Sequence, residues 1–230
     1  MISYKDKHII ITGACGGMGK ILCRALAQEG AKLSICSNDE TILDFAKELS
    51  CEVFAKICDV TKEDEVKGFF EDAFNMYGDF YALANLAGLS IPGQISDTEE
   101  DAYDLMMDVN VKGTFLCCKY FAQNAAADGA IIVNIGSMAA RNANANAPLY
   151  CTAKAAVNML SKGLRMQIAS KNIRVTAVNP GGTDTPFWGT RAVDRSKLMQ
   201  AEDVVDIILF VLKSNPSIQI HDIFFESSLK

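Results

Sequence analysis

The feature of this sequence that most constrains its fold is a glycine-rich turn near the amino terminus. The apolar run His8-Ile9-Ile10-Ile11-Thr12 leads into Gly13-Ala14-Cys15-Gly16-Gly17-Met18-Gly19, and a helical pattern follows over 20–29. Such a tight turn needs residues that tolerate positive φ and let another group approach the backbone. The N–H groups that open the next helix attract anions. The turn therefore favours a phosphate-containing ligand, although similar turns also occur without one.

The rest of the chain alternates short apolar runs with longer amphipathic stretches. We predict strands at residues 8–12, 32–36, 51–57, 81–85, 130–135, 173–178 and 219–225. We predict helices at residues 20–29, 40–49, 62–77, 99–110, 112–126, 150–169 and 201–213. Strands that are apolar without alternation are typical of parallel sheets covered on both faces. The pattern therefore predicts an α/β fold, a single domain over 1–230 with a doubly wound, Rossmann-type parallel sheet and helices on both faces.

Composition excludes several classes of partner. The net charge of -6 disfavours nucleic acid, because an acidic surface repels phosphate backbones. The eight cysteines form no C-x-x-C pair and are joined by only two histidines, so we expect no metal site and a reducing environment. We find no signal-peptide pattern and no apolar run long enough to span a membrane. We therefore expect a cytoplasmic protein that is not attached to a membrane.

Three polar residues in the second half suggest acid–base chemistry. Tyr150 and Lys154 are four residues apart, so on a helix they share one face. A nearby ammonium group favours the phenolate and is expected to lower the pKa of Tyr150, which would suit proton transfer to or from a substrate oxygen. Ser137 follows an apolar strand and could donate a hydrogen bond to the same oxygen. A Tyr-x-x-x-Lys pair alone could be an ordinary helix surface, but the serine upstream favours catalysis.

Several motifs, in this order, resemble those of the short-chain dehydrogenase/reductase family. They are the Thr12–Gly19 turn with its GxxxGxG spacing, Asp59, Asn85-Leu86-Ala87-Gly88, Asn110, Ser137, Tyr150-x-x-x-Lys154 and Pro180-Gly181. The resemblance covers about residue 5 to residue 187. Leu86 departs from the family pattern, which usually has a second asparagine there.

The resemblance implies a complete catalytic set. Tyr150 would act as general acid in reduction and as general base in oxidation. Lys154 would also hold the nicotinamide ribose, and Ser137 would orient the carbonyl. Asn110 would hold a water molecule that links Lys154 to solvent, although an asparagine inside a helix often just bonds the backbone.

The same resemblance implies an NAD(P) site along the ends of the strands. The implied cofactor-binding positions are Gly13, Cys15, Gly17, Met18, Gly19, Ser37, Asn38, Asp59, Val60, Asn85, Ala87, Gly88, Tyr150, Lys154, Pro180, Gly181, Thr183 and Thr185. A carboxylate after the second strand would favour NAD, and a basic group would favour NADP. That place holds Ser37-Asn38-Asp39, in which Ser37 stands at the position expected for an NAD-type aspartate and Asn38 at the one expected for an NADP-type arginine. The choice therefore stays open between NADP and NAD, with a slight preference for NADP.

The sequence indicates less about the substrate than about the cofactor. We expect a short lid over about residues 183–200, with Phe187 and Trp188 at the edge of an open pocket for a small ketone or secondary alcohol. Met138, Arg141 and the Ala/Asn-rich loop 139–147 are expected nearby. The three basic lid residues could bind an anionic substrate group, or could be solvated and balanced by nearby acids. These lid residues are Arg191, Arg195 and Lys197.

The resemblance leaves alternative functions open. One is a 3-oxoacyl-carrier-protein reductase, which the sequence around 221–226 weakens because it lacks a Gly-Gly common there. Another is an NAD(P)-binding regulator without chemistry, which the complete set of catalytic residues disfavours. A sugar-nucleotide epimerase is disfavoured by the GxxxGxG spacing. The resemblance also implies a homodimer or homotetramer that packs through the helices at 112–126 and 150–169.

Overall fold

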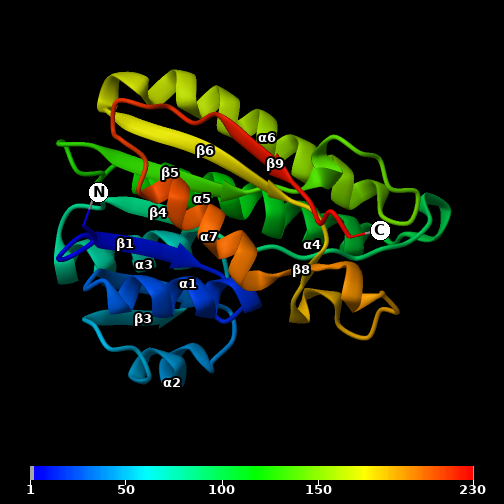
Figure 1. The fold of residues 1–230 in the computed structure, drawn as a ribbon, viewed down its shortest axis with the longest axis horizontal. Coiled ribbons are helices and arrows are strands. Elements are labelled where there is room, and N and C mark those ends of the chain that lie inside the picture. The colour runs from blue at the N-terminus through cyan, green and yellow to red at the C-terminus, as the bar shows by residue number, and fades with distance from the viewer. Residues whose placement is uncertain (1–2, 230) are drawn as a thin grey trace.

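Seven parallel strands form the central sheet, in the order β3-β2-β1-β4-β5-β6-β9 (Figure 1). The computed structural model describes residues 3–229. The strands are β1 (His8–Thr12), β2 (Lys32–Ser37), β3 (Val53–Ile57), β4 (Ala82–Asn85), β5 (Ala130–Ile135), β6 (Ile173–Pro180) and β9 (Asp222–Phe225). Each lies within or close to a strand predicted from the sequence. The predicted doubly wound α/β fold is therefore confirmed.

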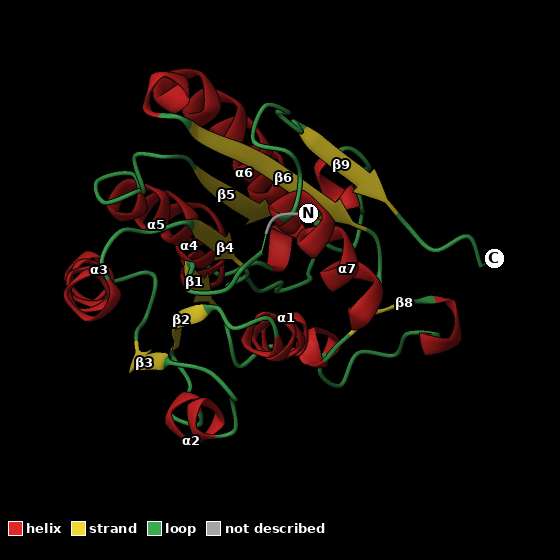
Figure 2. Ribbon diagram, turned by 60° about the vertical axis from the view of Figure 1, so that its left-hand side comes forward, coloured by secondary structure: helices red, strands yellow, loops and turns green. Residues whose placement is uncertain are grey.

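Helices cover both faces of this sheet (Figure 2). One face carries α1 (Gly17–Gln28), α2 (Ile42–Lys47) and α7 (Ala201–Leu212). The other carries α3 (Glu63–Tyr77), α4 (Glu100–Met107), α5 (Gly113–Phe121) and α6 (Pro148–Ile168). Successive side chains of β1 point to opposite faces: Ile9 and Ile11 pack in one core cluster and Ile10 in the other, and all three are fully buried. Burial on both sides explains the uninterrupted apolar strands.

The strand order reverses beside β1, which has β2 on one side and β4 on the other. The chain reaches β3 at the edge of the sheet and then returns to the centre to form β4. In sheets of this kind, ligands bind in the crevice outside the carboxyl ends of the strands at such a reversal. The glycine-rich turn follows β1, and Leu86 to Gly88 follow β4, so both lie at this crevice.

Several helix boundaries differ by a few residues from the sequence prediction; α5, for example, ends at Phe121 and not at residue 126. Two further differences lie near predicted catalytic residues. The predicted break near residue 111 is instead a π-helical turn, Asp108–Lys112, that joins α4 to α5. Helix α6 begins at Pro148 rather than at Tyr150, because a proline in the first turn needs no N–H partner. Both differences involve the helices that carry Asn110 and Tyr150.

The predicted lid is closed at its base by two short strands that the sequence did not reveal. β7 (Thr183–Asp184) pairs in parallel with β8 (Met199–Gln200). This pairing holds the two ends of the predicted lid together. The chain enters the lid directly after β6, so both ends lie near the carboxyl end of that strand. None of the helices within residues 3–229 combines the length and apolarity required to cross a bilayer.

Candidate active site

The glycine-rich turn fits tightly against its surroundings. Gly13 has a φ of +65°, and a Cβ there would lie 2.7 Å from the backbone nitrogen of Ala87. A Cβ on Gly19 would lie 2.4 Å from the carbonyl oxygen of Gly13. Helix α1 begins after Gly16 with no side-chain cap and no acidic residue in its first turn. Its first N–H groups therefore face the crevice without a side-chain partner, which suits a phosphate group.

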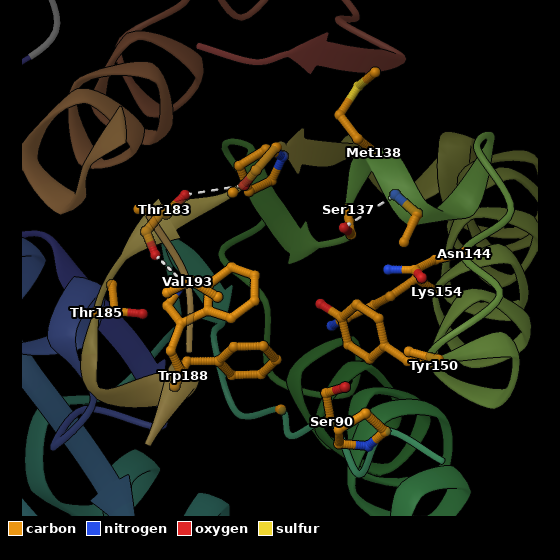
Figure 3. A pocket seen from close by; sticks show the side chains of 18 of the residues that line it. Ser90, Ser137, Met138, Asn144, Tyr150, Lys154, Thr183, Thr185, Trp188 and Val193 are labelled. Carbon is orange, nitrogen blue, oxygen red and sulfur yellow. Dashed lines mark hydrogen bonds between the residues drawn. The ribbon is translucent and has the colours of Figure 1, made fainter. Parts of the chain in front are cut away.

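Helix α6 presents Tyr150 and Lys154 at the same wall of a cavity of about 810 Å³ (Figure 3). The Nζ of Lys154 lies 5.6 Å from the centre of the Tyr150 ring. Lys154 is only 3% exposed and donates a hydrogen bond to the carbonyl oxygen of Ile135 at 3.1 Å. The predicted face shared by Tyr150 and Lys154 is therefore present, with the ammonium held by the end of β5.

Ser137 lies beside Tyr150, at the point where the chain leaves β5. Its hydroxyl accepts a hydrogen bond from the backbone N–H of Ala139 at 3.1 Å. Its own N–H donates to the side-chain oxygen of Asn179 at 3.1 Å. Asn158 donates to that same Asn179 oxygen at 2.7 Å. A buried pair of amides from β6 and α6 thus fixes the backbone of Ser137, a role that no sequence motif predicted.

Asn110 occupies the π-helical turn, where its side chain bonds two backbone carbonyls. Its Nδ2 donates to Leu89 at 2.8 Å and to Met106 at 2.9 Å, while its buried Oδ1 has no partner within residues 3–229. A Cβ on Gly88 would lie 3.0 Å from that Oδ1 and 3.3 Å from the Nζ of Lys154. A buried acceptor without a partner suits an ordered water molecule. The position beside Lys154 is the one that the expected proton relay requires.

The pKa of Tyr150 does not follow the sequence prediction. Burial raises the pKa of Tyr150 to about 12, and the Ser137 hydroxyl and the charge of Arg191 oppose this rise. Burial lowers the pKa of Lys154 to about 8. The sequence predicted that Lys154 would lower the pKa of Tyr150, but in the free protein this pKa is raised, because burial is the largest influence on it. Tyr150 is therefore a neutral phenol at pH 7 and can donate a proton.

Many of the predicted site residues line the cavity, and the others lie along the edge of the sheet. Predicted residues that line it are Met18, Gly88, Ser137, Tyr150, Lys154, Pro180, Gly181, Thr183 and Thr185. The predicted residues outside its lining are Gly13, Cys15, Gly17, Gly19, Ser37, Asn38, Asp59, Val60, Asn85, Ala87 and Asn110. Most of the second group follow β1, β2, β3 and β4, so they extend along the carboxyl edge from the cavity.

Some polar side chains along this edge already have partners within the fold. Asp59 accepts a hydrogen bond from the N–H of Thr61 at 2.9 Å and so caps the turn after β3. Asn85 donates to Asn134 at 2.8 Å between β4 and β5. Ser37 accepts a hydrogen bond from the N–H of Asp39 at 3.2 Å. A ligand at this edge would contact the backbone of Asn85, because the Asn85 side chain already forms a hydrogen bond inside the sheet.

Loops that carried no family motif supply much of the remaining cavity wall. Asn142 to Ala147, in the Ala/Asn-rich loop, all line the cavity, and Figure 3 shows the Asn144 amide pointing into it. Ser90 and Pro92 line it from the segment after β4. The two loops are joined by a hydrogen bond from the N–H of Gly93 to the carbonyl of Asn146 at 3.0 Å. The position of the first loop just before Tyr150 predicted that it lies near the site, whereas nothing in the sequence pointed to Ser90.

Within residues 3–229, no group of His, Cys, Asp or Glu side chains has an arrangement that could hold a metal ion. The residues at the cavity instead fit a dinucleotide cofactor. The uncapped start of α1 offers N–H groups for phosphates, and the side-chain oxygen of Asn110 lacks a partner beside Lys154. Together they provide donors and acceptors for a bound nucleotide and an ordered water.

Comparison with known proteins agrees with this arrangement. The family model described as short chain dehydrogenase matches residues 7–196. The chain is 29% identical over 234 residues to an uncharacterized oxidoreductase of Staphylococcus saprophyticus, covering 97% of this chain and 98% of that protein. It is 30% identical over 231 residues to an uncharacterized oxidoreductase of Staphylococcus aureus, with the same coverage of each chain.

Solved structures share the fold at lower identity. A short-chain type dehydrogenase/reductase from Mycobacterium ulcerans has a TM-score of 0.90 at 23% identity, covering 98% of this chain and 90% of that one. An alcohol dehydrogenase from Thermococcus sibiricus, complexed with 5-hydroxy-NADP, has a TM-score of 0.87 at 23% identity, covering 97% of each chain. From the family match over most of its length, this protein belongs to the short-chain dehydrogenase/reductase family of oxidoreductases.

Proposed function

We propose that this protein is an NAD(P)-dependent oxidoreductase that interconverts a ketone and a secondary alcohol. The observation that carries the proposal is the meeting of Ser137, Tyr150 and Lys154 in one cavity beside the glycine-rich turn. When bound, the nicotinamide would supply or accept the hydride. The protein, acting as a single domain over 1–230, would hold the cofactor and move the proton.

In reduction, the residues of the cavity act on the carbonyl oxygen. Ser137 orients this oxygen by a hydrogen bond, and Tyr150 donates its proton as negative charge develops there. Lys154 binds the nicotinamide ribose and returns a proton to Tyr150, and water held by Asn110 restores it from solvent. The raised pKa of Tyr150 supports this direction at neutral pH, because the phenol stays protonated until it is needed.

The cofactor would lie along the carboxyl edge, on the positions that the family resemblance implies. NADP is slightly preferred, since no carboxylate at Ser37 or Asn38 would repel a ribose phosphate. The 5-hydroxy-NADP complex of the Thermococcus sibiricus relative is consistent with this preference. We further propose a cytoplasmic homodimer or homotetramer that packs through α5 and α6, whose exposed side chains include Phe115, Met159 and Met166.

A titration of the purified protein with NADH and with NADPH, followed by nicotinamide fluorescence, tests the proposed cofactor site. We expect both to bind, with NADPH preferred by less than about tenfold, or 1.4 kcal/mol, because neither Ser37 nor Asn38 carries a charge that would strongly favour one cofactor. A panel of ketones, with an acetoacetyl thioester included, then tests reduction. Failure of both cofactors to bind would refute the proposal.

Lys154 predicts a pH dependence of cofactor use. Its pKa of about 8 means that Lys154 loses its charge above that pH, and with it a donor to the ribose hydroxyls. We expect kcat/KM for the reduced cofactor to fall as pH rises above about 8, since this ratio reports groups of the free enzyme. Lys154→Met should abolish the fall in kcat/KM above about pH 8 and should lower kcat/KM at lower pH. A parent profile that stays level to about pH 9.5 would contradict the assignment.

A further inference from the structure

The structure distinguishes the three basic residues of the lid, which the sequence could not. Arg195 forms an ion pair with Asp184, and the Nζ of Lys197 lies 3.9 Å from a carboxylate oxygen of Asp194. These two cations are exposed and balanced by neighbouring acids. Arg191 forms no ion pair within residues 3–229 and lines the cavity. The alternative that the basic lid residues are solvated and balanced by nearby acids therefore holds for Arg195 and Lys197. It does not hold for Arg191.

The charged lining of the cavity has one sign. Lys154 and Arg191 are the charged side chains among its lining residues, and no aspartate or glutamate of residues 3–229 lines it. The protein as a whole carries a net charge of -6, so this cavity differs in sign from the average surface. A concave site lined by one sign of charge attracts ligands of the opposite sign. In our proposed function Lys154 binds the cofactor, which leaves Arg191 for the substrate.

Arg191 is held in place with part of its guanidinium free. Its Nε donates to the carbonyl of Trp188 at 2.8 Å, and its Nη2 donates to the carbonyl of Phe187. The guanidinium carbon lies 5.1 Å from the Phe187 ring centre and 5.0 Å from the Trp188 ring centre. Its Nη1 has no hydrogen-bond partner in the described part of the chain. Two donors of Nη1 are thus available, on a side chain whose orientation is already fixed.

This guanidinium lies close to the reacting groups. The ring centres of Phe187 and Tyr150 are 5.8 Å apart, so Phe187 contacts both Tyr150 and Arg191. The charge of Arg191 also acts on the ionisation of Tyr150. A ligand whose carbonyl oxygen meets Tyr150 would therefore bring a group a few bonds away within reach of Arg191.

We propose that the substrate is an oxo carboxylate and that the Nη1 group of Arg191 binds its carboxylate. This inference rests on the proposed function, because it places the carbonyl of the same molecule at Tyr150 and Ser137. A carboxylate suits the site because a guanidinium nitrogen forms strong, charge-assisted hydrogen bonds with it. Phe187 and Trp188 would pack along the carbon chain between the two ends.

Turnover of matched substrates tests the inference. We would compare 2-oxobutanoate, acetoacetate and levulinate with their methyl esters, in the parent protein and in Arg191→Gln, Arg191→Lys and Arg195→Gln. We expect at least one acid to exceed its ester in kcat/KM by about 30-fold, since a hydrogen bond to a charged group contributes about 1.5–3 kcal/mol. Arg191→Gln should remove this difference, because it lowers kcat/KM far more for the acid than for the ester. Arg191→Lys should keep part of it, and Arg195→Gln should keep all of it.

A binding measurement without cofactor separates this inference from the proposed function. Trp188 is the single tryptophan of the chain and lies against Arg191, so its fluorescence reports on this site. We expect the acids to change the emission at lower concentration than the esters, and Arg191→Gln to abolish that difference. If no carbonyl compound is reduced but this preference remains, the carboxylate site stands and the reductase proposal fails. Equal binding of acid and ester, equal losses for both in Arg191→Gln, or weaker cofactor binding in that variant would overturn the inference.

Discussion

Replacing Tyr150 with phenylalanine should lower kcat for ketone reduction by about 1,000-fold, within the range for loss of a general acid. The variant keeps the ring that packs against Phe187 and removes only the hydroxyl that would donate the proton. Cofactor affinity should stay within about threefold of the parent, because in the proposed site the phosphate and ribose contacts would come mainly from the glycine-rich turn and Lys154. Stopped-flow turnover and nicotinamide fluorescence measure the two quantities.

Tyr81→Phe is the matched control for this variant. The hydroxyl of Tyr81 is buried and has no hydrogen-bond partner within residues 3–229. Tyr81 comes just before β4, at the end of the sheet opposite the cavity. Removal of an unpaired buried hydroxyl should leave stability equal or higher, and turnover unchanged. If Tyr150→Phe retains more than about a tenth of the parent kcat, Tyr150 is not the proton donor.

Gly19→Ala should destabilise the protein and prevent cofactor binding. The added Cβ would lie 2.4 Å from the carbonyl oxygen of Gly13 and 2.8 Å from the Cα of Ala14, so the backbone of the turn must move. Overpacking of this kind costs about 3 kcal/mol. For a chain of this length that is roughly a 6–12 °C decrease in Tm. Circular dichroism melts and the cofactor titration measure both effects.

Gly68→Ala makes the same chemical change on another helix and should have the opposite sign. Gly68 lies within α3, away from the helices proposed to pack against another copy, and the nearest neighbour of a Cβ there would be the flexible end of Lys56 at 3.4 Å. Alanine favours the helix over glycine by about 1 kcal/mol, so Tm should rise by roughly 2–4 °C. Cofactor affinity should not change. A Gly19→Ala protein as stable as the parent, or one that still binds cofactor normally, would contradict the tight fit inferred for the turn.

Much of the fold and of the candidate site follows from local sequence patterns. The central strands of the sheet were predicted because β1 and its neighbours bury both faces, which leaves uninterrupted apolar runs in the sequence. Tyr150 and Lys154 share a face because a four-residue spacing brings two side chains together on any helix. The π-helical turn at Asn110 was missed, since its hydrogen bond to Leu89 involves a residue from another element.

Local sequence patterns predicted the order of the elements, the place of the glycine-rich turn and the family resemblance. These properties depend on residues that are near one another in the chain, so periodicity and spacing reveal them. Only the tertiary structure showed that burial is the largest influence on the pKa of Tyr150 and that Asn179 holds the backbone of Ser137. It also showed that, within residues 3–229, Arg195 forms an ion pair and Arg191 forms none. Desolvation and charge pairing depend on which distant segments pack together, and that information is not present in any local stretch of sequence.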